Sequence, residues 1–468
     1  MTRTYNARYV FGISAVAALG GLLFGYDWVV IGGAKPFYEA FFRLHTEYQV
    51  GWANSCALIG CLFGSIASGA LSERLGRKRL LILSALLFAI SSVLTGWAMA
   101  FVWFVTWRIA GGVAIGMASN VSPMYIAEIS PEQWRGRLVS LNQLTIVGGI
   151  LGAQVVNWLI ARPVPAAATA EMIRQSWNGQ FGWRWMFSAV AVPAAIFFVC
   201  ALFVPESPRW LAKRNHVEGA RRVLARIGGA LYAEEAVSAI RLSIGSEPRV
   251  RISEVLAPGL RPILAVGIAL AVLQQASGIN VIFNYAEEIY RGAGYSVNGV
   301  MFNIVITGAI NLAFTLVALG FVDRIGRRAL MLAGCASIAA SHTLLGLAYH
   351  FGLKGMPVLV LTLCTIGCYS MTLAPVTWVL ISEIFPNRVR GPAIAIAVSA
   401  LWIACFALTY TFPLLNAALG PAGTFWVYAA VCIAGFVFVK QRVPETKGRT
   451  LEQIENELRP LAKPLPER

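Results

Sequence analysis

The sequence has few charged residues. Asp, Glu, Lys and Arg make up 13% of its 468 positions, whereas an ordinary soluble domain carries roughly 25%. So few charges cannot cover the surface of a soluble fold of this size, which argues against a cytosolic enzyme. Hydrophobic residues make up 57% of the chain, and they form long runs that need a lipid environment. The composition therefore predicts a protein that crosses a membrane many times.

Cysteine and histidine are scarce and scattered. The eight cysteines lie in apolar segments without a spacing suited to a metal, and the four histidines are far apart. No Ser/His, Cys/His or paired-carboxylate set suggests catalysis. We therefore expect no enzyme, no metal and no bound cofactor. The N-terminal apolar run is longer than that of a signal peptide and has no small-residue cleavage site, so it is interpreted as a first membrane helix.

The net charge of +16 comes from unevenly placed basic residues. In a soluble protein it would suggest nucleic-acid binding. Here clusters such as 74–79, 209–261 and 324–328 alternate with loops that hold only Lys35, Arg43, Arg162, Arg174, Arg184, Arg291 and Lys354. This alternation follows the positive-inside rule. It predicts a multi-pass protein of the cell membrane with both termini in the cytoplasm. In a bacterium this would be the inner membrane. It also predicts that the protein has no nucleic-acid partner.

Twelve apolar runs of about 20 residues predict twelve membrane helices. They lie near 10–33, 50–71, 80–97, 102–122, 138–160, 185–204, 262–286, 299–321, 330–350, 358–380, 392–415 and 423–440. The long polar segment between the sixth and seventh runs has helical periodicity, which predicts short amphipathic helices. We therefore expect an all-α membrane fold with an N-terminal six-helix bundle, a cytoplasmic linker, a C-terminal six-helix bundle and a cytoplasmic tail, over residues 1–204, 205–261, 262–441 and 442–468.

Three motifs occur twice in the same order. ERLGRK at 73–78 returns as DRIGRR at 323–328, and EISP with a following Arg-Gly returns as EIFP with Arg390-Gly391. PESP after the sixth run returns as PET after the twelfth. The two halves are therefore interpreted as parallel repeats, an organisation typical of secondary transporters that work by alternating access.

These motifs, together with PESPRWL, PETKG and QQxxGIN in the seventh run, resemble the sugar porter family of the major facilitator superfamily over nearly the whole chain. That family includes bacterial sugar–proton symporters, those for xylose among them, and facilitative glucose transporters. The resemblance implies the major facilitator fold, a monosaccharide substrate (hexose or pentose), a proton as coupling ion and a chain that works as a monomer in the lipid bilayer.

Asp27 and Arg108 are the two ionisable residues that we expect inside membrane spans. An unpaired charge there costs roughly 2.5–3.5 kcal/mol, so such residues usually face the interior and pair. A static ion pair that orients two helices is one interpretation, and a proton switch is the other. Similar proton symporters carry Asp and Arg at these motif positions, whereas uniporters have a neutral residue in the first helix. Those symporters also have a Glu in the sixth helix, where this chain has Val190.

Polar residues in apolar helices are costly unless they find partners. They can join helices, but amides also suit sugar hydroxyls, and an indole covers the apolar face of a sugar ring. By resemblance, the substrate-binding residues are Phe24, Gln143, Gln274, Gln275, Asn280, Asn284, Asn311, Trp378 and Trp402. Two positions depart from the family. Asn284 replaces a Tyr of the outer gate, and Leu401 replaces an amide before Trp402.

Charged residues repeat at the predicted cytoplasmic ends of helices. A solvated surface explains the excess of arginine, but not the repeated acidic partners. By resemblance we expect a cytoplasmic gate formed by Glu73, Arg74, Arg77, Glu128, Arg135, Glu206, Asp323, Arg324, Arg327, Glu383, Arg390 and Glu445. The glycine spacings Gly60xxxGly64, Gly112xxxGly116 and Gly148xxxGly152 predict close helix packing.

The sequence therefore predicts a secondary transporter that imports a monosaccharide by proton symport. One alternative is a facilitative uniporter of a sugar or polyol. An alternative of another class is a transporter-like sugar sensor.

Overall fold

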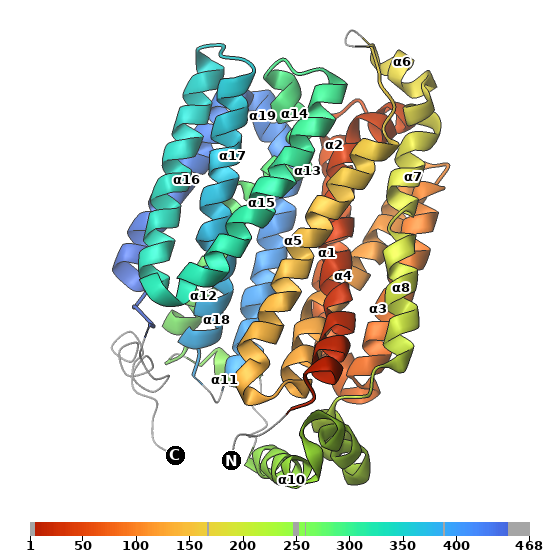
Figure 1. The fold of residues 1–468 in the computed structure, drawn as a ribbon. Coiled ribbons are helices and arrows are strands. Elements are labelled where there is room, and N and C mark those ends of the chain that lie inside the picture. The colour runs from red at the N-terminus through yellow and green to blue at the C-terminus, as the bar shows by residue number, and fades with distance from the viewer. Residues whose placement is uncertain (1–4, 166–167, 247–251, 258, 387–388, 448–468) are drawn as a thin grey trace. The chain divides into compact units, whose positions relative to one another are not determined.

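The computed structural model describes residues 5–165, 168–246, 252–257, 259–386 and 389–447, without the side chains of 245–246, 252–253 and 322–324. In these ranges every regular element is a helix (Figure 1). The elements of the N-terminal part are α1 (Ala7–Phe42), α2 (Glu47–Leu75), α3 (Arg77–Gly96), α4 (Phe101–Ile129), α5 (Glu132–Ile160), α6 (Ala170–Gln175), the π-helix η1 (Asn178–Gly182), α7 (Trp183–Ser188) and α8 (Ala191–Phe203).

The later elements begin with the predicted linker. They are α9 (Pro208–Lys213), α10 (Val217–Ser246), α11 (Ile252–Val255), α12 (Arg261–Ala276), α13 (Ile279–Asn284), α14 (Ala286–Gly292), α15 (Val297–Ile325), α16 (Arg327–His350), α17 (Met356–Met371), α18 (Leu373–Ile384) and α19 (Arg390–Arg442).

The long helices agree with the predicted spans. Eleven helical segments of the described chain are long and apolar enough to cross a membrane. The last of them, α19, has non-helical backbone at Gly420 with φ of +67°, which separates the eleventh and twelfth predicted spans. The all-α membrane fold predicted from the sequence is confirmed.

Several spans are longer or more broken than the apolar runs that predicted them. α1 continues past residue 33, through Pro36, to Phe42, because polar residues end an apolar run without ending a helix. The seventh span is divided into α12 and α13, with a left-handed glycine, Gly278, at φ of +85° between them, and α14 follows the span. Glycine adopts this conformation without steric cost, so the break lies directly beside the predicted amide cluster.

The described residues fall into two compact units. Unit 1 comprises Met1–Val30, Ile59–Ile160 and Phe181–Pro248, and unit 2 comprises Ile31–Leu58, Ala161–Gln180 and Arg249–Arg468. Helices α1 and α2 are thus each divided between the two units. The boundaries at residues 204, 261 and 441, which follow the sequence repeat, stay a prediction.

Glycines bring α2 and α4 together inside unit 1. A Cβ atom on Gly60 would overlap the carbonyl oxygen of Ile109, one on Gly64 would overlap that of Val113, and one on Gly116 would overlap that of Cys61. The close packing predicted from Gly60xxxGly64 and Gly112xxxGly116 is confirmed. The prediction is wrong for Gly148xxxGly152, because a Cβ on Gly148 would have no atom within 4 Å and one on Gly152 would lie 3.9 Å from a Tyr26 ring carbon.

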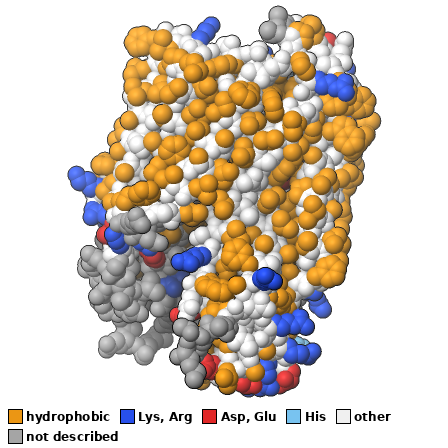
Figure 2. All heavy atoms as spheres, viewed as in Figure 1, with side chains coloured by type: hydrophobic (Ala, Val, Ile, Leu, Met, Phe, Trp, Pro, Cys, Tyr) orange, Lys and Arg blue, Asp and Glu red, His pale blue; other side chains and the backbone are white. Residues whose placement is uncertain are grey.

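Hydrophobic side chains cover much of the surface of the long helices. In α8 the exposed side chains include Val192, Ile196, Val199 and Phe203. Figure 2 shows hydrophobic side chains over α7 and α8, whereas Lys, Arg, Asp and Glu gather over α10. An apolar outer face of this kind fits lipid rather than water. The amphipathic helices predicted for the linker are present as α9 and α10.

We expect Gly60→Ala to lower the thermal unfolding midpoint of the purified protein in detergent. The new Cβ would meet backbone atoms of α4, and overpacking of this kind costs about 1–3 kcal/mol. Gly69→Ala is the matched control, because it lies in the same helix with no atom within 4 Å of its Cβ position. Equal unfolding midpoints for the two variants would contradict close packing of α2 and α4.

Candidate functional site

Asp27 of α1 and Arg108 of α4 form a buried ion pair in unit 1. Arg108 Nη1 lies 2.9 Å from Asp27 Oδ1, and each residue is 3% exposed. The Arg108 guanidinium also lies 5.4 Å from the centre of the Phe187 ring. The structure thus brings together the two residues that the sequence selected.

The Asp27 carboxylate is only half satisfied. Its Oδ2 atom is buried and has no hydrogen-bond partner among the described residues. A Cβ on Gly111 would lie 3.3 Å from this atom and 3.2 Å from Ser91 Oγ, so the glycine leaves room beside it. Asp27 therefore keeps one acceptor oxygen that Arg108 does not occupy.

Two further basic residues, which the charge pattern places in loops, are buried in helices. Lys35 and Arg184 lie in α1 and α7 and are 2% and 5% exposed. Arg184 donates to the carbonyl oxygens of Gly96 and Ala98 at 3.0 and 3.1 Å. That Asp27 and Arg108 are the two ionisable residues inside membrane spans stays a prediction.

Three predicted sugar-binding amides are connected in unit 2. Gln275 Nε2 donates to Gln274 Oε1 at 3.3 Å, and Asn280 Nδ2 donates to Gln275 Oε1. Gln274 Nε2 lies 3.5 Å from the carbonyl oxygen of Ala374 in α18. Asn280 Nδ2 also contacts Cys405 Sγ at 3.2 Å. These groups form a row across the break at Gly278, and they are already oriented by one another.

The other predicted residues of unit 2 differ in their surroundings. Asn311 Oδ1 accepts a hydrogen bond from Ser370 Oγ at 2.6 Å. Asn284 is 3% exposed, and its Oδ1 has no hydrogen-bond partner among the described residues. Leu401 and Trp402 are both 3% exposed, whereas Trp378 is 42% exposed.

The two predicted sugar contacts of unit 1 are half-buried. Phe24 packs edge-to-face on Trp28, with ring centroids 6.1 Å apart. Gln143 lies in α5 and is half-buried. Gln154, eleven residues further along α5, was not selected from the sequence. It is 1% exposed, and neither of its amide atoms has a hydrogen-bond partner among the described residues. Eleven residues are about three helical turns, so Gln154 lies on the same face of α5 as Gln143. This spacing could have identified Gln154 from the sequence.

The predicted gate residues of unit 1 surround Arg77. Its Nη2 atom lies 2.9 Å from both Glu73 Oε1 and Glu128 Oε1, and its side chain is 6% exposed. Glu206 Oε1 accepts hydrogen bonds from the backbone N–H groups of Arg77 and Lys78 at 2.9 and 3.1 Å. Glu206 therefore satisfies free N–H groups at the start of α3.

Unit 2 repeats this arrangement. Glu445 Oε1 accepts from the backbone N–H of Arg327 at 3.0 Å, and Oε2 accepts from that of Arg328 at 3.2 Å. Burial opposes ionisation of Glu445, but hydrogen bonds from the backbone N–H groups of Lys447, Arg327 and Arg328 lower the pKa of its carboxyl below the usual value. Arg327 Nη2 lies 3.7 Å from Glu383 Oε1, a looser pair than in unit 1. The sequence repeat is thus a structural repeat of helix capping and ion pairing.

The remaining gate residues are not joined in this way. Arg74 and Arg135 are exposed, and Arg135 Nε donates to the carbonyl oxygen of Ala127 at 3.2 Å. Arg390 Nε donates to that of Phe385 at 3.4 Å. The side chains of Asp323 and Arg324 lie outside the described residues. A gate formed by the whole set stays a prediction.

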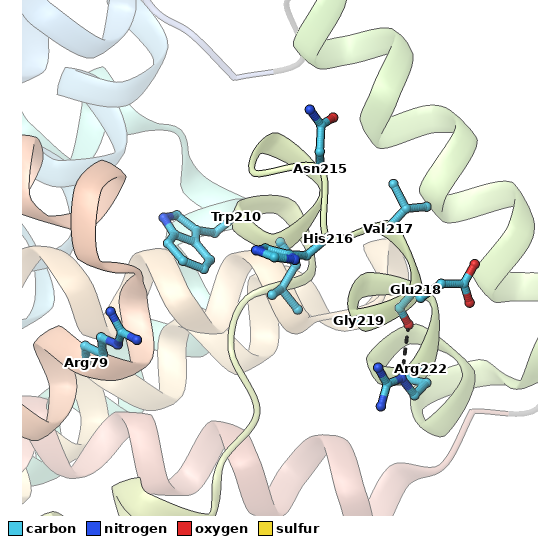
Figure 3. Close-up of a pocket in the computed structure, with 9 residues that line it drawn as sticks. Arg79, Trp210, Asn215, His216, Val217, Glu218, Gly219 and Arg222 are labelled. Carbon is cyan, nitrogen blue, oxygen red and sulfur yellow. Dashed lines mark hydrogen bonds between the residues drawn. The ribbon is translucent and has the colours of Figure 1, made fainter.

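A cavity of about 610 Å³ lies beside the linker helices of unit 1. In Figure 3, Glu218 points away from Trp210 and His216, and Arg222 bonds back to the backbone of its own helix. None of the predicted sugar contacts lines this cavity, which is bounded by Arg79, Trp210, Leu211, Asn215, His216, Val217, Glu218, Gly219 and Arg222. It is a hollow between α3, α9 and α10, separate from the ion pair and the amides.

A helical membrane protein with repeated charged motifs and a buried ion pair is typical of a secondary transporter. The family model described as "Sugar (and other) transporter" matches residues 13–458, and the chain belongs to this family. Like its relatives, it is a multi-pass membrane protein.

Relatives of known name cover nearly the whole chain. The chain is 38% identical over 456 residues to the arabinose-proton symporter of Bacillus subtilis, with 97% of this chain and 96% of that protein covered. It is 37% identical over 486 residues to the D-xylose-proton symporter of Escherichia coli, with 97% of each covered. A partially occluded, inward-open structure of the xylose transporter XylE from E. coli matches with a TM-score of 0.84 and 35% identity, over 95% of this chain and 100% of that one.

We expect Arg77→Ala to destabilise the protein by about 3–5 kcal/mol, because it leaves a buried carboxylate at Glu128 without its cation. The measurement is chemical or thermal unfolding in detergent. Arg74→Ala is the control at an exposed arginine three residues away, where a change within about 0.5 kcal/mol is expected. Similar losses in both variants would show that the Arg77 ion pairs do not stabilise unit 1.

Proposed function

We propose that the protein imports a monosaccharide, a pentose or a hexose, by proton symport through alternating access. The observation that carries this proposal is the buried Asp27–Arg108 pair, in which one carboxylate oxygen has no donor. Membership of the sugar transporter family and the proton symporters among the relatives support it.

Coupling follows from competition for the Asp27 carboxylate. In this structure Arg108 neutralises the charge of Asp27. A proton on Asp27 removes the attraction and leaves the guanidinium to find other acceptors, so helix positions and protonation depend on each other. One proton moving down 100 mV releases about 2.3 kcal/mol, which corresponds to roughly 40-fold accumulation of sugar.

Sugar recognition is assigned to the amides beside the break at Gly278. Gln274, Gln275 and Asn280 hydrogen-bond one another in the described structure. Each amide donates and accepts, so a sugar hydroxyl can replace a neighbouring amide without leaving a buried polar atom unpaired. Leu401 lacks a hydrogen-bonding group, which favours a substrate with no hydroxyl at that point or with its ring turned differently.

A facilitative uniporter is the second candidate. Val190, where similar symporters have a glutamate, is fully buried and apolar, so the proton site has fewer carboxylates than theirs. A transporter-like sensor would bind sugar without flux, and the experiment below distinguishes all three.

The proposal also covers the membrane, the orientation and the partners of the protein. Both termini face the cytoplasm, because the basic clusters follow the positive-inside rule. The chain works in the cell membrane, in a bacterium the inner membrane, as a monomer. Its partners are the sugar, the proton and the lipid bilayer, and it needs no bound cofactor and carries out no chemical conversion.

We expect Asp27→Asn to abolish uphill sugar uptake in proteoliposomes with an imposed proton gradient, while sugar exchange at equal concentrations persists. Wild type and variant are tested with D-xylose, L-arabinose, D-glucose and myo-inositol, with and without an uncoupler. The control is Glu234→Gln, which removes a carboxylate that pairs with Arg221 on the exposed linker. Uptake that ignores the gradient in the wild type indicates the uniporter, and binding without flux indicates the sensor.

We expect Gln275→Leu to weaken sugar binding by about 10-fold to 100-fold, because a buried polar partner left unpaired costs about 1–3 kcal/mol. Isothermal titration calorimetry with the transported sugar measures this change. Gln175→Leu, at an exposed glutamine of α6, is the control. An unchanged Kd in Gln275→Leu would remove this residue from the sugar site.

A further inference from the structure

The C-terminal segment of α1, residues 31–42, crosses α13 at very short range inside unit 2. A Cβ on Gly32 would lie 2.6 Å from the carbonyl oxygen of Phe283 and 3.6 Å from Asn284 Cα. Lys35 lies about one turn beyond this crossing on α1, and Glu288 lies in α14, the helix that follows α13. The backbone approach at Gly32 therefore sets two charged side chains, 253 positions apart in the chain, against each other.

Lys35 is held by two carboxylates from different helices. Its Nζ lies 2.9 Å from Glu39 Oε1, one turn further along α1, and it is ion-paired with Glu288 Oε1 of α14. The Lys35 side chain is 2% exposed, and its Nζ lies 5.4 Å from the centre of the Tyr285 ring. A lysine this deeply buried keeps its charge only because its partners are anionic.

The cluster formed by Lys35, Glu39 and Glu288 holds more acidic than basic groups. The adjacent Glu287 has its own cation, because Arg291 Nη1 lies 2.9 Å from Glu287 Oε1. Lys35 therefore balances only one of its two carboxylates, Glu39 and Glu288. Glu288 Oε2 is inaccessible to solvent and has no hydrogen-bond partner among the described residues. One bound proton would neutralise the excess charge and supply a donor at that oxygen.

Further titratable and charged groups of the neighbouring elements act on these three residues or on their direct neighbours. Besides Lys35, Glu39 and Glu288 they are Tyr38 on α1, Glu47 at the start of α2, Tyr285, Glu287 and Arg291 at α13–α14, and Tyr428 on α19. The only cations in this set are Lys35 and Arg291, so the others cannot cancel the excess negative charge.

We propose that Lys35, Glu39 and Glu288 form a second proton-binding site, separate from Asp27–Arg108, whose proton holds the C-terminal segment of α1 against α14. Unlike the Asp27 pair, which joins α1 to α4 in unit 1, this site joins α1 to α14 within unit 2. It does not depend on the substrate or on the coupling proposed above.

The pH dependence has a defined sign. Burial raises the pKa of the Glu288 carboxyl above its usual range; Lys35 opposes this rise, while Glu287 and Glu39 add to it. The folded contact therefore binds the proton more tightly than the separated groups do. Its stabilising effect is complete at acidic pH and is lost as the pH rises through the raised pKa, when the cluster acquires its unpaired negative charge.

The direct test is infrared titration of the full-length protein in lipid, which detects the C=O stretch of a protonated carboxyl. We expect the wild type to show one such band that persists above the pH at which ordinary glutamates ionise. Glu288→Gln should abolish it. Glu39→Gln should shift its titration to lower pH, because Lys35 then neutralises Glu288 fully.

Two further variants make the result specific. Glu171→Gln removes an exposed carboxylate of unit 2 that pairs with Arg174 and should leave the band unchanged. Asp27→Asn should also leave it unchanged, so failure of the coupling proposal does not remove this site. A band that survives in Glu288→Gln, or no band in the wild type, would overturn the proposal.

The structural consequence is measured by amide hydrogen exchange, corrected for the intrinsic effect of pH. Protection of residues 31–42 and of α14 should decrease in the wild type as the pH rises, and should be independent of pH in Glu288→Gln. The same pH dependence in both proteins would show that the proton does not hold the two segments together.

Discussion

Every charge buried in a membrane-spanning helix of this protein needs a partner, and this need organises the rest of the structure. The free energy needed to place an unpaired charge in lipid exceeds the stabilisation that most single contacts provide. Asp27 and Arg108 form an ion pair across α1 and α4, and Arg184 donates hydrogen bonds to two backbone carbonyl oxygens. Helix packing at glycines such as Gly60 then brings these partners within reach.

The same constraint explains why the charged motifs occur twice. In unit 1, the Glu206 carboxylate accepts hydrogen bonds from backbone N–H groups at the start of α3. In unit 2, the Glu445 carboxylate accepts hydrogen bonds from those at the start of α16. Each cap follows a glycine with a positive φ, Gly76 or Gly326, where a side chain would collide with the glutamate. The repeated Gly-Arg and Pro-Glu motifs therefore act together as an N-terminal helix cap, which fixes where the helix begins.

The sequence predicted what depends on local composition and missed what depends on distant partners. Apolar runs located the spans, and two charges within such runs identified Asp27 and Arg108. Lys35 follows the apolar run at 10–33 and was therefore assigned to a loop, and only the fold brings Glu288 to it. The break at Gly278 lies within an apolar run, so hydropathy could not detect it. The choice of sugar depends on single groups such as Leu401, which no composition pattern encodes.

Symport requires that proton and sugar cross the membrane together. The decisive measurement records the internal pH of proteoliposomes with a trapped dye while sugar is added outside, with the membrane potential clamped at zero. We expect the interior to become more acidic when sugar enters, and the acidification to stop when the sugar gradient is removed. Sugar entry without any change of internal pH would contradict it.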